Sequence, residues 1–215
     1  MAEKLGEYHR KRDFSRTPEP SGRSGKRPAT RPSDEPGFVI QHHLATSDHY
    51  DFRLEVDGVL KSWAVPKGPS PDPAQKRLAV PTEDHPLDYA DFEGIIGEGE
   101  YGGGTVMVWD TGSYRNTTEH KGEALSMSDG LDRGHVTFRL AGTKLGGEYA
   151  LTRTRTSPKA QWILVKMRDA DASARRDPVK SATKSALSGR TMRQIETDAR
   201  SANMDTHRAE TGDDR

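Results

Sequence analysis

The segment from Gln41 to Asp57 carries the residues best suited to chemistry, because imidazole, carboxylate and guanidinium groups alternate along it. In the stretch HYDFRLE, His49, Asp51 and Arg53 occupy every second position. A β-strand sends successive side chains to opposite faces, so these three would share one face. The apolar side chains would then share the other face, namely Tyr50, Phe52, Leu54 and Val56. We therefore predict a strand with one core face and one face that forms a site.

A further histidine, His43, precedes His49 and could reach the same place from an adjoining turn or strand. His43, His49 and Asp51 then offer two nitrogens and one oxygen to a divalent metal. Such a set serves either a hydrolytic metal or the iron of a non-haem oxygenase. A polar strand face with incidental histidines is the alternative without a metal.

Basic residues accompany the proposed metal strand, and they help to choose between these chemistries. The candidates for phosphate binding are Arg53, Lys67, Arg77 and His85. Phosphoryl hydrolysis needs a divalent cation and several donors that stabilise charge on phosphate oxygens. An oxygenase that binds one small acid has less use for them. For each basic residue taken singly, the simplest interpretation is a solvated surface charge. The occurrence of all four beside the histidines favours phosphoryl hydrolysis.

Short strands separated by turn signals must position these residues. Strand patterns are found at residues 38–43, 49–56, 59–65, 77–82, 105–110, 135–141, 148–155 and 161–167. Asp57-Gly58 is a strong hairpin signal between the second and third of them. The pattern predicts a mainly β fold, a barrel of about eight strands, with the polar face of HYDFR in its concave interior.

Helical signals are few, and they lie outside the strand patterns. A short helix could start near residue 7 and must stop near Pro18, and Pro86 favours one turn of helix after His85. Residues 185–200 could form a capped helix whose apolar residues, among them Ile195, would bury little. The glycine-rich stretch 94–104 fits neither the dinucleotide turn nor the P-loop, so we predict tight turns there.

Composition divides the chain into a folded body and two polar ends. Residues 37–168 contain all three tryptophans and form the predicted folded body. This body has 15 Lys and Arg residues against 18 Asp and Glu residues, which excludes general electrostatic binding of nucleic acid. Residues 21–36 are predicted to be a flexible link, and residues 169–215 a weakly ordered charged tail. The chain has no cysteine, no apolar run of about 20 residues and no signal peptide pattern, so we expect a cytoplasmic protein without membrane contact.

Three stretches, residues 49–80, 83–94 and 99–110, resemble the 3′-phosphoesterase module of the bacterial non-homologous end-joining ligase, ligase D. The similarity extends from about Lys11 to Met167. It implies an eight-stranded barrel flanked by short helices and a manganese-dependent enzyme. Such an enzyme removes a 3′-terminal ribonucleoside and then the 3′-phosphate. The implied partners are the 3′ ends of DNA or DNA/RNA primer-templates and end-joining proteins such as Ku, ligase and polymerase.

The resemblance also implies roles for individual residues. His43, His49 and Asp51 match metal ligands. The matched catalytic positions are His85, Tyr89, Arg53, Asp13 and Glu19, and the matched phosphate-binding positions are Arg12, Gln41, Arg53, Lys67 and Arg77. Residues 1–20 would therefore form an arm that contributes to the active site. The tail from residue 169 has no matched catalytic position.

Length and the resemblance together define the hypotheses. Because 215 residues hold neither a polymerase nor a ligase domain, we expect a free-standing phosphoesterase. A catalytically silent module that binds DNA ends or a repair complex is the alternative. The intact His43, His49, Asp51, His85 and Tyr89 speak against it.

Overall fold

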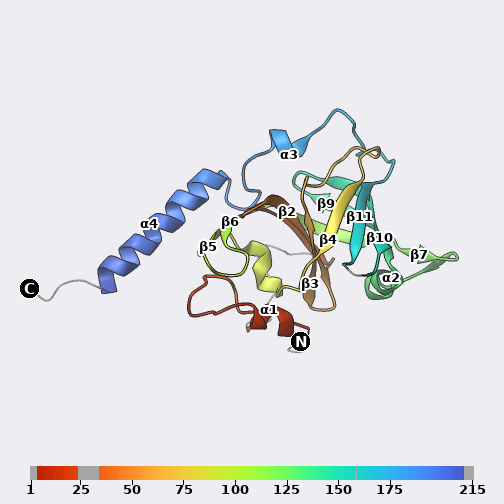
Figure 1. The fold of residues 1–215 in the computed structure, drawn as a ribbon. Coiled ribbons are helices and arrows are strands. Elements are labelled where there is room, and N and C mark those ends of the chain that lie inside the picture. Colours follow the sequence, from red (N-terminus) through yellow and green to blue (C-terminus); the bar gives the residue numbers. More distant parts are fainter. Residues whose placement is uncertain (1–3, 24–33, 158, 211–215) are drawn as a thin grey trace, which may run out of the picture.

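A closed barrel of antiparallel strands dominates the computed structural model, which describes residues 4–23, 34–157 and 159–210, with side chains up to residue 201 (Figure 1). Its eight strands are β1 (Gly37–Leu44), β2 (Asp48–Val56), β3 (Val59–Val65), β4 (Arg77–Pro81), β6 (Gly104–Asn116), β9 (His135–Gly142), β10 (Gly146–Arg155) and β11 (Gln161–Lys166). They follow the order β1-β2-β3-β4-β11-β10-β9-β6, and pairing of β6 with β1 closes the ring. The predicted fold class and all eight predicted strands are confirmed. Most of the predicted link, residues 24–33, lies outside the described residues.

Smaller elements decorate the barrel. They are α1 (Gly6–Arg10), the 3₁₀ helix η1 (Leu87–Asp91), β5 (Gly94–Ile96), β7 (Glu119–His120), β8 (Glu123–Ala124), α2 (Met127–Arg133), α3 (Pro178–Ser181) and α4 (Met192–Glu210). The β2–β3 hairpin turns through Asp57 and Gly58, whose φ angles of 49° and 83° suit a tight two-residue connection. In the glycine-rich stretch, Gly99 and Gly102 also have positive φ, at 87° and 77°, as expected for tight turns.

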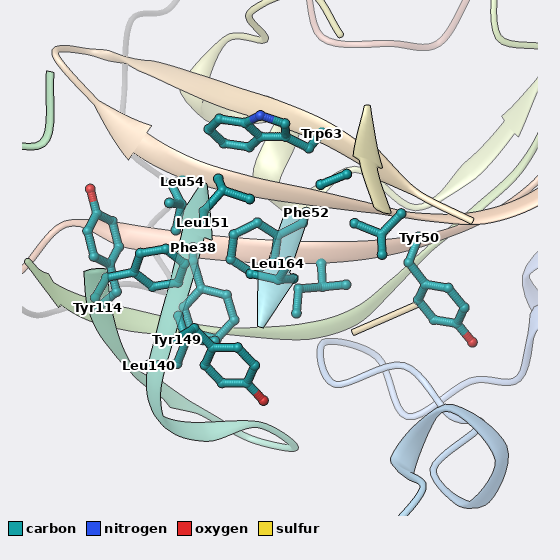
Figure 2. Close-up of a cluster of buried hydrophobic side chains, with 14 of the residues drawn as sticks. Phe38, Tyr50, Phe52, Leu54, Trp63, Tyr114, Leu140, Tyr149, Leu151 and Leu164 are labelled. Atoms are coloured by element: carbon teal, nitrogen blue, oxygen red, sulfur yellow. The ribbon is translucent and has the colours of Figure 1, made fainter. Parts of the chain in front are cut away.

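The barrel interior is apolar. Side chains from all eight strands meet in it, and Figure 2 shows ten of them labelled: Phe38, Tyr50, Phe52, Leu54, Trp63, Tyr114, Leu140, Tyr149, Leu151 and Leu164. Because Phe52 and Leu54 point inward, Asp51 and Arg53 must point outward. The expectation that the barrel interior holds the polar face was therefore wrong. The interior is filled by the apolar face of β2, and the site face is on the outside.

A second apolar layer covers this outer face. Tyr8 of α1 and Tyr89 of η1 are 0% and 2% exposed, and they pack with Val39, Leu60 and Val108 from the barrel strands. In Figure 1, α1 and η1 lie together beside β3, below the barrel. The outer face of the barrel is thus covered here by α1 and η1, two segments that lie far apart in the sequence.

The segment after the barrel also contacts it. Trp109 Nε1 donates a hydrogen bond of 2.8 Å to the Ala182 carbonyl oxygen, and Ile195 of α4 is 1% exposed within the main apolar cluster. Thr191 and Gln194 form a capping box at the start of α4, with Thr191 N donating to Gln194 Oε1 over 2.9 Å. The prediction that Ile195 would bury little was wrong. None of the helices in the described ranges is long and apolar enough to span a membrane.

Candidate active site

The pairing of β1 with β2 brings the predicted metal ligands together. In the antiparallel register His43 lies opposite His49, and Gln41 lies opposite Asp51. Directly opposed residues share a face of the sheet, and so do residues two apart on one strand. Four polar side chains from two short stretches therefore meet on the outer face. The spacing of six residues between the two histidines is what places them across the hairpin.

His43, His49 and Asp51 form a group that could hold a metal ion, with their ligand atoms within 4.8 Å of one another. His43 Nδ1 lies 3.7 Å from Asp51 Oδ2, and His49 Nε2 lies 3.7 Å from Asp51 Oδ1. His49 Nδ1 is 2.8 Å from the Ser47 carbonyl oxygen, so it carries the proton and leaves the Nε2 lone pair available. Two imidazoles and a carboxylate fit a divalent transition metal.

The His43 ring adds an independent sign that the group is incomplete without a ligand. His43 is 7% exposed, and its Nε2 is buried without a hydrogen-bond partner among the described residues. A buried polar atom without a partner costs free energy, and a bound ligand would remove this cost. The ring edge also lies near Gly102, where an added Cβ would be 3.8 Å from His43 Cε1.

Arg53 links the metal group to the rest of the site. Its guanidinium donates to Gln41 Oε1 over 2.8 Å, to Ser62 Oγ over 2.9 Å and to Asp51 Oδ2 over 2.9 Å. Gln41 in turn donates to the carbonyl oxygens of Tyr89 and Phe92, which anchors η1. Gln41 therefore holds Arg53 and η1 in place.

The electrostatics keep Asp51 ionised. Burial acts to raise the pKa of Asp51, but the Arg53 guanidinium and the two histidines outweigh it and hold this pKa below its usual range. The carboxylate is thus a permanent anion at neutral pH. Asp51 is available as a metal ligand without first losing a proton.

His85 lies on the other side of Arg53. Arg53 Nη1 is 2.8 Å from His85 Nδ1, and Arg12 Nη2 is 3.4 Å from His85 Nε2. Burial and the charges of Arg53 and Arg12 lower the pKa of His85 well below its ordinary value. The imidazole is therefore neutral at pH 7, in a place where an added anion would favour its protonation.

The N-terminal arm completes this arrangement. Arg12 Nε donates to Glu19 Oε1 over 2.8 Å, and Tyr89 Oη donates to the same oxygen over 3.0 Å. Glu19 also accepts from Thr17 Oγ1 over 2.9 Å. Burial and then the Glu19 charge raise the pKa of Tyr89 well above its ordinary value, so its hydroxyl stays protonated. Glu19 thus fixes both the arginine of the arm and the tyrosine of η1.

A carboxylate that sequence reasoning missed binds the arm from the barrel side. Glu83 is 7% exposed, and its two oxygens accept from Arg12 Nη1 over 3.0 Å and from Lys11 Nζ over 3.1 Å. The Arg12 guanidinium stacks on the Tyr8 ring in a cation–π contact, with its carbon 3.9 Å from the ring centroid. Neither residue has a sequence signal of its own, since only the fold brings the arm to β4 and η1.

These groups line one cavity of about 190 Å³. Its walls include all three metal-ligand candidates, both arginines and the two η1-side residues, namely His43, His49, Asp51, Arg12, Arg53, His85 and Tyr89, together with Glu83 and Tyr101. A divalent cation held by the trio would lie next to two guanidinium groups and a neutral imidazole. Such a cavity suits a phosphate ester.

Comparison with known proteins agrees with a site for a phosphate ester. Residues 41–153 match the model of the DNA ligase D 3′-phosphoesterase domain. The chain belongs to this family. It is 51% identical over 191 residues to the multifunctional non-homologous end joining protein LigD of Pseudomonas aeruginosa, covering 87% of this chain and 22% of that protein. It is 47% identical over 156 residues to the corresponding DNA repair protein of Mycobacterium tuberculosis, covering 72% of this chain and 19% of that protein. The chain spans about a fifth of the length of these curated relatives.

Five of the positions matched to the phosphoesterase family do not line the cavity. Gln41 and Glu19 hold the neighbouring side chains described above, and the other three are Lys67, Arg77 and Asp13. Lys67 is exposed, and Arg77 on β4 donates to Gln75 Oε1, with its Nε buried and unpartnered among the described residues. Asp13 is exposed and accepts from Ser15 Oγ over 2.6 Å, which shapes a turn of the arm. The phosphate-binding roles of Gln41, Lys67 and Arg77 and the catalytic roles of Asp13 and Glu19 stay predictions.

Proposed function

We propose that this chain is a metal-dependent phosphoesterase that heals DNA 3′ ends. It removes a 3′-terminal ribonucleoside and then the remaining 3′-phosphate, which leaves a 3′-hydroxyl group. One observation carries the proposal: the trio His43, His49 and Asp51 shares a single cavity with Arg53, Arg12 and neutral His85. Membership of the ligase D phosphoesterase family supports a role in processing DNA ends.

The trio would hold a divalent cation, for which we propose Mn²⁺. When bound, such a cation polarises a phosphoryl oxygen and lowers the pKa of a bound water. His49 offers Nε2, because its Nδ1 proton is donated to the Ser47 carbonyl oxygen. Asp51 offers the charge that Arg53 maintains.

The arginines position the phosphate. Arg53 and Arg12 each carry a planar guanidinium fork, which is a charged donor for phosphate oxygens. Each fork is held in a fixed orientation, Arg53 by Gln41 and Ser62, and Arg12 by Glu19 and Glu83. Donors that are fixed before the substrate binds lower the cost of reorganisation in the transition state.

His85 supplies a proton to the leaving group. It is neutral because burial and the charges of Arg53 and Arg12 outweigh the charge of Asp51, but a bound phosphate brings further negative charge and raises the pKa of His85. In the first step water bonds to phosphorus and loses one proton to the solvent. The bond between phosphorus and O5′ of the terminal ribonucleoside breaks, and protonated His85 gives its proton to O5′, so the nucleoside leaves with a 5′-hydroxyl group. The strand keeps a 3′-phosphate, which a second attack by water removes as inorganic phosphate.

Two synthetic primers test the proposal, one ending in a single ribonucleotide and one ending in a 3′-phosphate. We expect wild-type protein with Mn²⁺ to convert both to a 3′-hydroxyl end, and excess chelator to stop both reactions. Binding of the primers without conversion would instead support the silent end-binding module. No effect of chelator on turnover would reject the metal-dependent mechanism.

The proposal extends to the repair pathway and the protein partners. The relatives carry names that assign them to non-homologous end joining. A repaired 3′-hydroxyl is the group that a polymerase extends and a ligase joins. We therefore propose that the chain acts on DNA ends before these two reactions, beside end-joining proteins such as Ku, ligase and polymerase.

A further inference from the structure

A second cavity lies next to the proposed active site and shares its wall. It has a volume of about 600 Å³, and Ala45, Ile96 and Gly102 line both cavities. Its remaining walls come from the β1–β2 turn, from the glycine-rich segment 97–104 and from Glu196 and Arg200 of α4. The two cavities are therefore neighbours, so a substrate bound in the smaller cavity has the larger one beside it.

The sizes of the two cavities suggest how a substrate divides between them. About 190 Å³ accommodates a metal ion and a phosphate group, but it leaves no room for a sugar and a base. Pockets for small organic ligands usually have volumes of about 300–1,000 Å³, and the second cavity falls in this range. The second cavity is therefore large enough for the nucleoside attached to the scissile phosphate.

The charges of the second cavity disfavour a nucleic-acid backbone. Its walls carry the carboxylates of Glu98, Glu100 and Glu196 and one guanidinium, that of Arg200. Glu196 is paired with Arg200 over 2.7 Å and Glu100 with Arg16 over 2.9 Å, whereas Glu98 has no ion-pair partner among the described residues. A further phosphate would be repelled here, but an uncharged group would not.

The chemistry of the walls fits a ribonucleoside. Carboxylate oxygens accept hydrogen bonds, and the ribose at a strand terminus has two neighbouring hydroxyl groups that donate them. Leu44, 45% exposed, and Ile95 on the same walls offer apolar contact to a base. We propose that the second cavity binds the terminal ribonucleoside, the leaving group of the first reaction, with Glu98 accepting from its ribose hydroxyls. This inference rests on the proposed function.

The two reactions of the enzyme provide an internal control. Only the first reaction has a nucleoside as leaving group, because the second releases inorganic phosphate from the strand. We expect Glu98→Ala to lower kcat/KM about fivefold to tenfold for the ribonucleotide-ended primer, as for loss of one hydrogen bond to an exposed charge. Removal of a 3′-phosphate should stay within about twofold of wild type. Glu123→Ala, at an exposed carboxylate of β8, serves as the matched control and should change neither reaction.

Free adenosine gives a second readout that does not depend on a mutant rate. We expect it to inhibit ribonucleoside removal by wild type, and to inhibit the Glu98→Ala variant less. Equal effects of Glu98→Ala on both primers, or no effect on either, would overturn the assignment while leaving the phosphoesterase itself intact. Wild-type protein that converts neither primer would instead reject the proposed function, and the ribonucleoside site with it.

Discussion

The two faces of β2 are both buried, but the inner face is apolar and the outer face is charged. On the inner face Phe52 and Leu54 are 1% and 0% exposed, and they pack among aromatic and aliphatic side chains. On the outer face Asp51 and Arg53 are 6% and 2% exposed, and their charges are compensated by each other. Apolar residues would satisfy the outer face at no electrostatic cost. A buried charge network that faces a cavity therefore indicates chemistry rather than stability.

Another buried charge sharpens this comparison. The Lys166 side chain is 0% exposed, and its ammonium donates to the carbonyl oxygens of Glu148 and Met167 and to the Asp169 carboxylate. All three of its N–H groups have acceptors, so no donor is left for a ligand. In the site, by contrast, His43 Nε2 has no partner within the described part of the chain. The Lys166 network is thus complete without a ligand, whereas His43 in the site is not.

The largest expected effect follows from removing a metal ligand on the outer face. His49→Ala should abolish both 3′-end reactions, because loss of one of three protein ligands removes or misplaces the metal. The barrel should remain folded, since His49 is not part of the main apolar cluster. Hydrolysis of both primers and the metal content after gel filtration measure the effect. The matched control is His135→Ala, at an exposed histidine of β9. Near wild-type turnover that still requires metal would show that His49 is not a ligand.

Deleting residues 1–20 tests whether the outer face depends on the arm. The deletion removes Arg12 and Glu19, so we expect both reactions to be lost. The main apolar cluster contains no residue of the arm, so the barrel should remain folded. Circular dichroism and 3′-end processing measure the two outcomes together. An active truncated protein would remove Arg12 and Glu19 from the proposed machinery.

Phe52→Ala tests the inner face. Truncation of a buried phenylalanine costs about 3–5 kcal/mol of the free energy of unfolding. The activity of the folded fraction should stay near wild type, because Phe52 points away from the cavity. Urea denaturation and turnover corrected for the folded fraction separate the two effects. Leu78→Ala, at a residue that is 39% exposed on β4, should change stability by less than about 0.5 kcal/mol. Loss of turnover in folded Phe52→Ala would show that the two faces are coupled.

Periodicity in the sequence was enough to predict most of the fold and the centre of the site. Each barrel strand has an apolar alternation and a turn signal, and the alternation of His49, Asp51 and Arg53 put these residues on one face. Local pattern is sufficient here because a strand fixes side-chain direction by itself. Family resemblance added Arg12 and Glu19, whose segment has no strand or helix pattern that points to a site.

What sequence reasoning missed depends on contacts between distant segments. Alternation separates the faces of β2 but does not say which is inside when both are covered, and so the site was placed in the wrong compartment. Tyr8 and Glu83 have no local signal, because they meet only after the arm folds onto the barrel. Ile195 lies in a polar segment, yet α4 delivers it to the main apolar cluster. The predicted weak order of residues 169–215 stays a prediction, which the contacts of Ala182 and Ile195 do not favour.

Arg53→Lys tests whether the outer face needs a planar fork. Lysine keeps the charge but cannot donate to Gln41, Ser62 and Asp51 at once. Losing charged hydrogen bonds of about 1.5–3 kcal/mol predicts a fall of roughly 10- to 100-fold in kcat/KM. Arg139→Lys, in a surface ion pair with Asp171, is the control. The same change at Arg77 tests the remaining prediction, since near wild-type activity would exclude phosphate binding by that residue.

The smallest expected effect is a pH dependence of stability caused by His85. An unfolded histidine has a pKa of about 6.5, whereas burial, Arg53 and Arg12 hold the pKa of His85 well below that value in the folded protein. Below pH 6.5 the unfolded chain binds a proton that the folded chain does not bind. The contribution of His85 to stability is therefore complete above pH 6.5 and is lost as the pH falls, by up to about 1.4 kcal/mol per pH unit.

Urea denaturation with chelator present at pH 7.5, 6.5 and 5.5 measures this loss in wild type. His85→Gln should lack it, so the stability difference between the two proteins should shrink toward pH 5.5. His135→Gln, at an exposed histidine, should keep the wild-type pH profile. A constant difference between wild type and His85→Gln across the three pH values would mean that His85 is not held neutral, and proton donation by His85 would then need no bound phosphate.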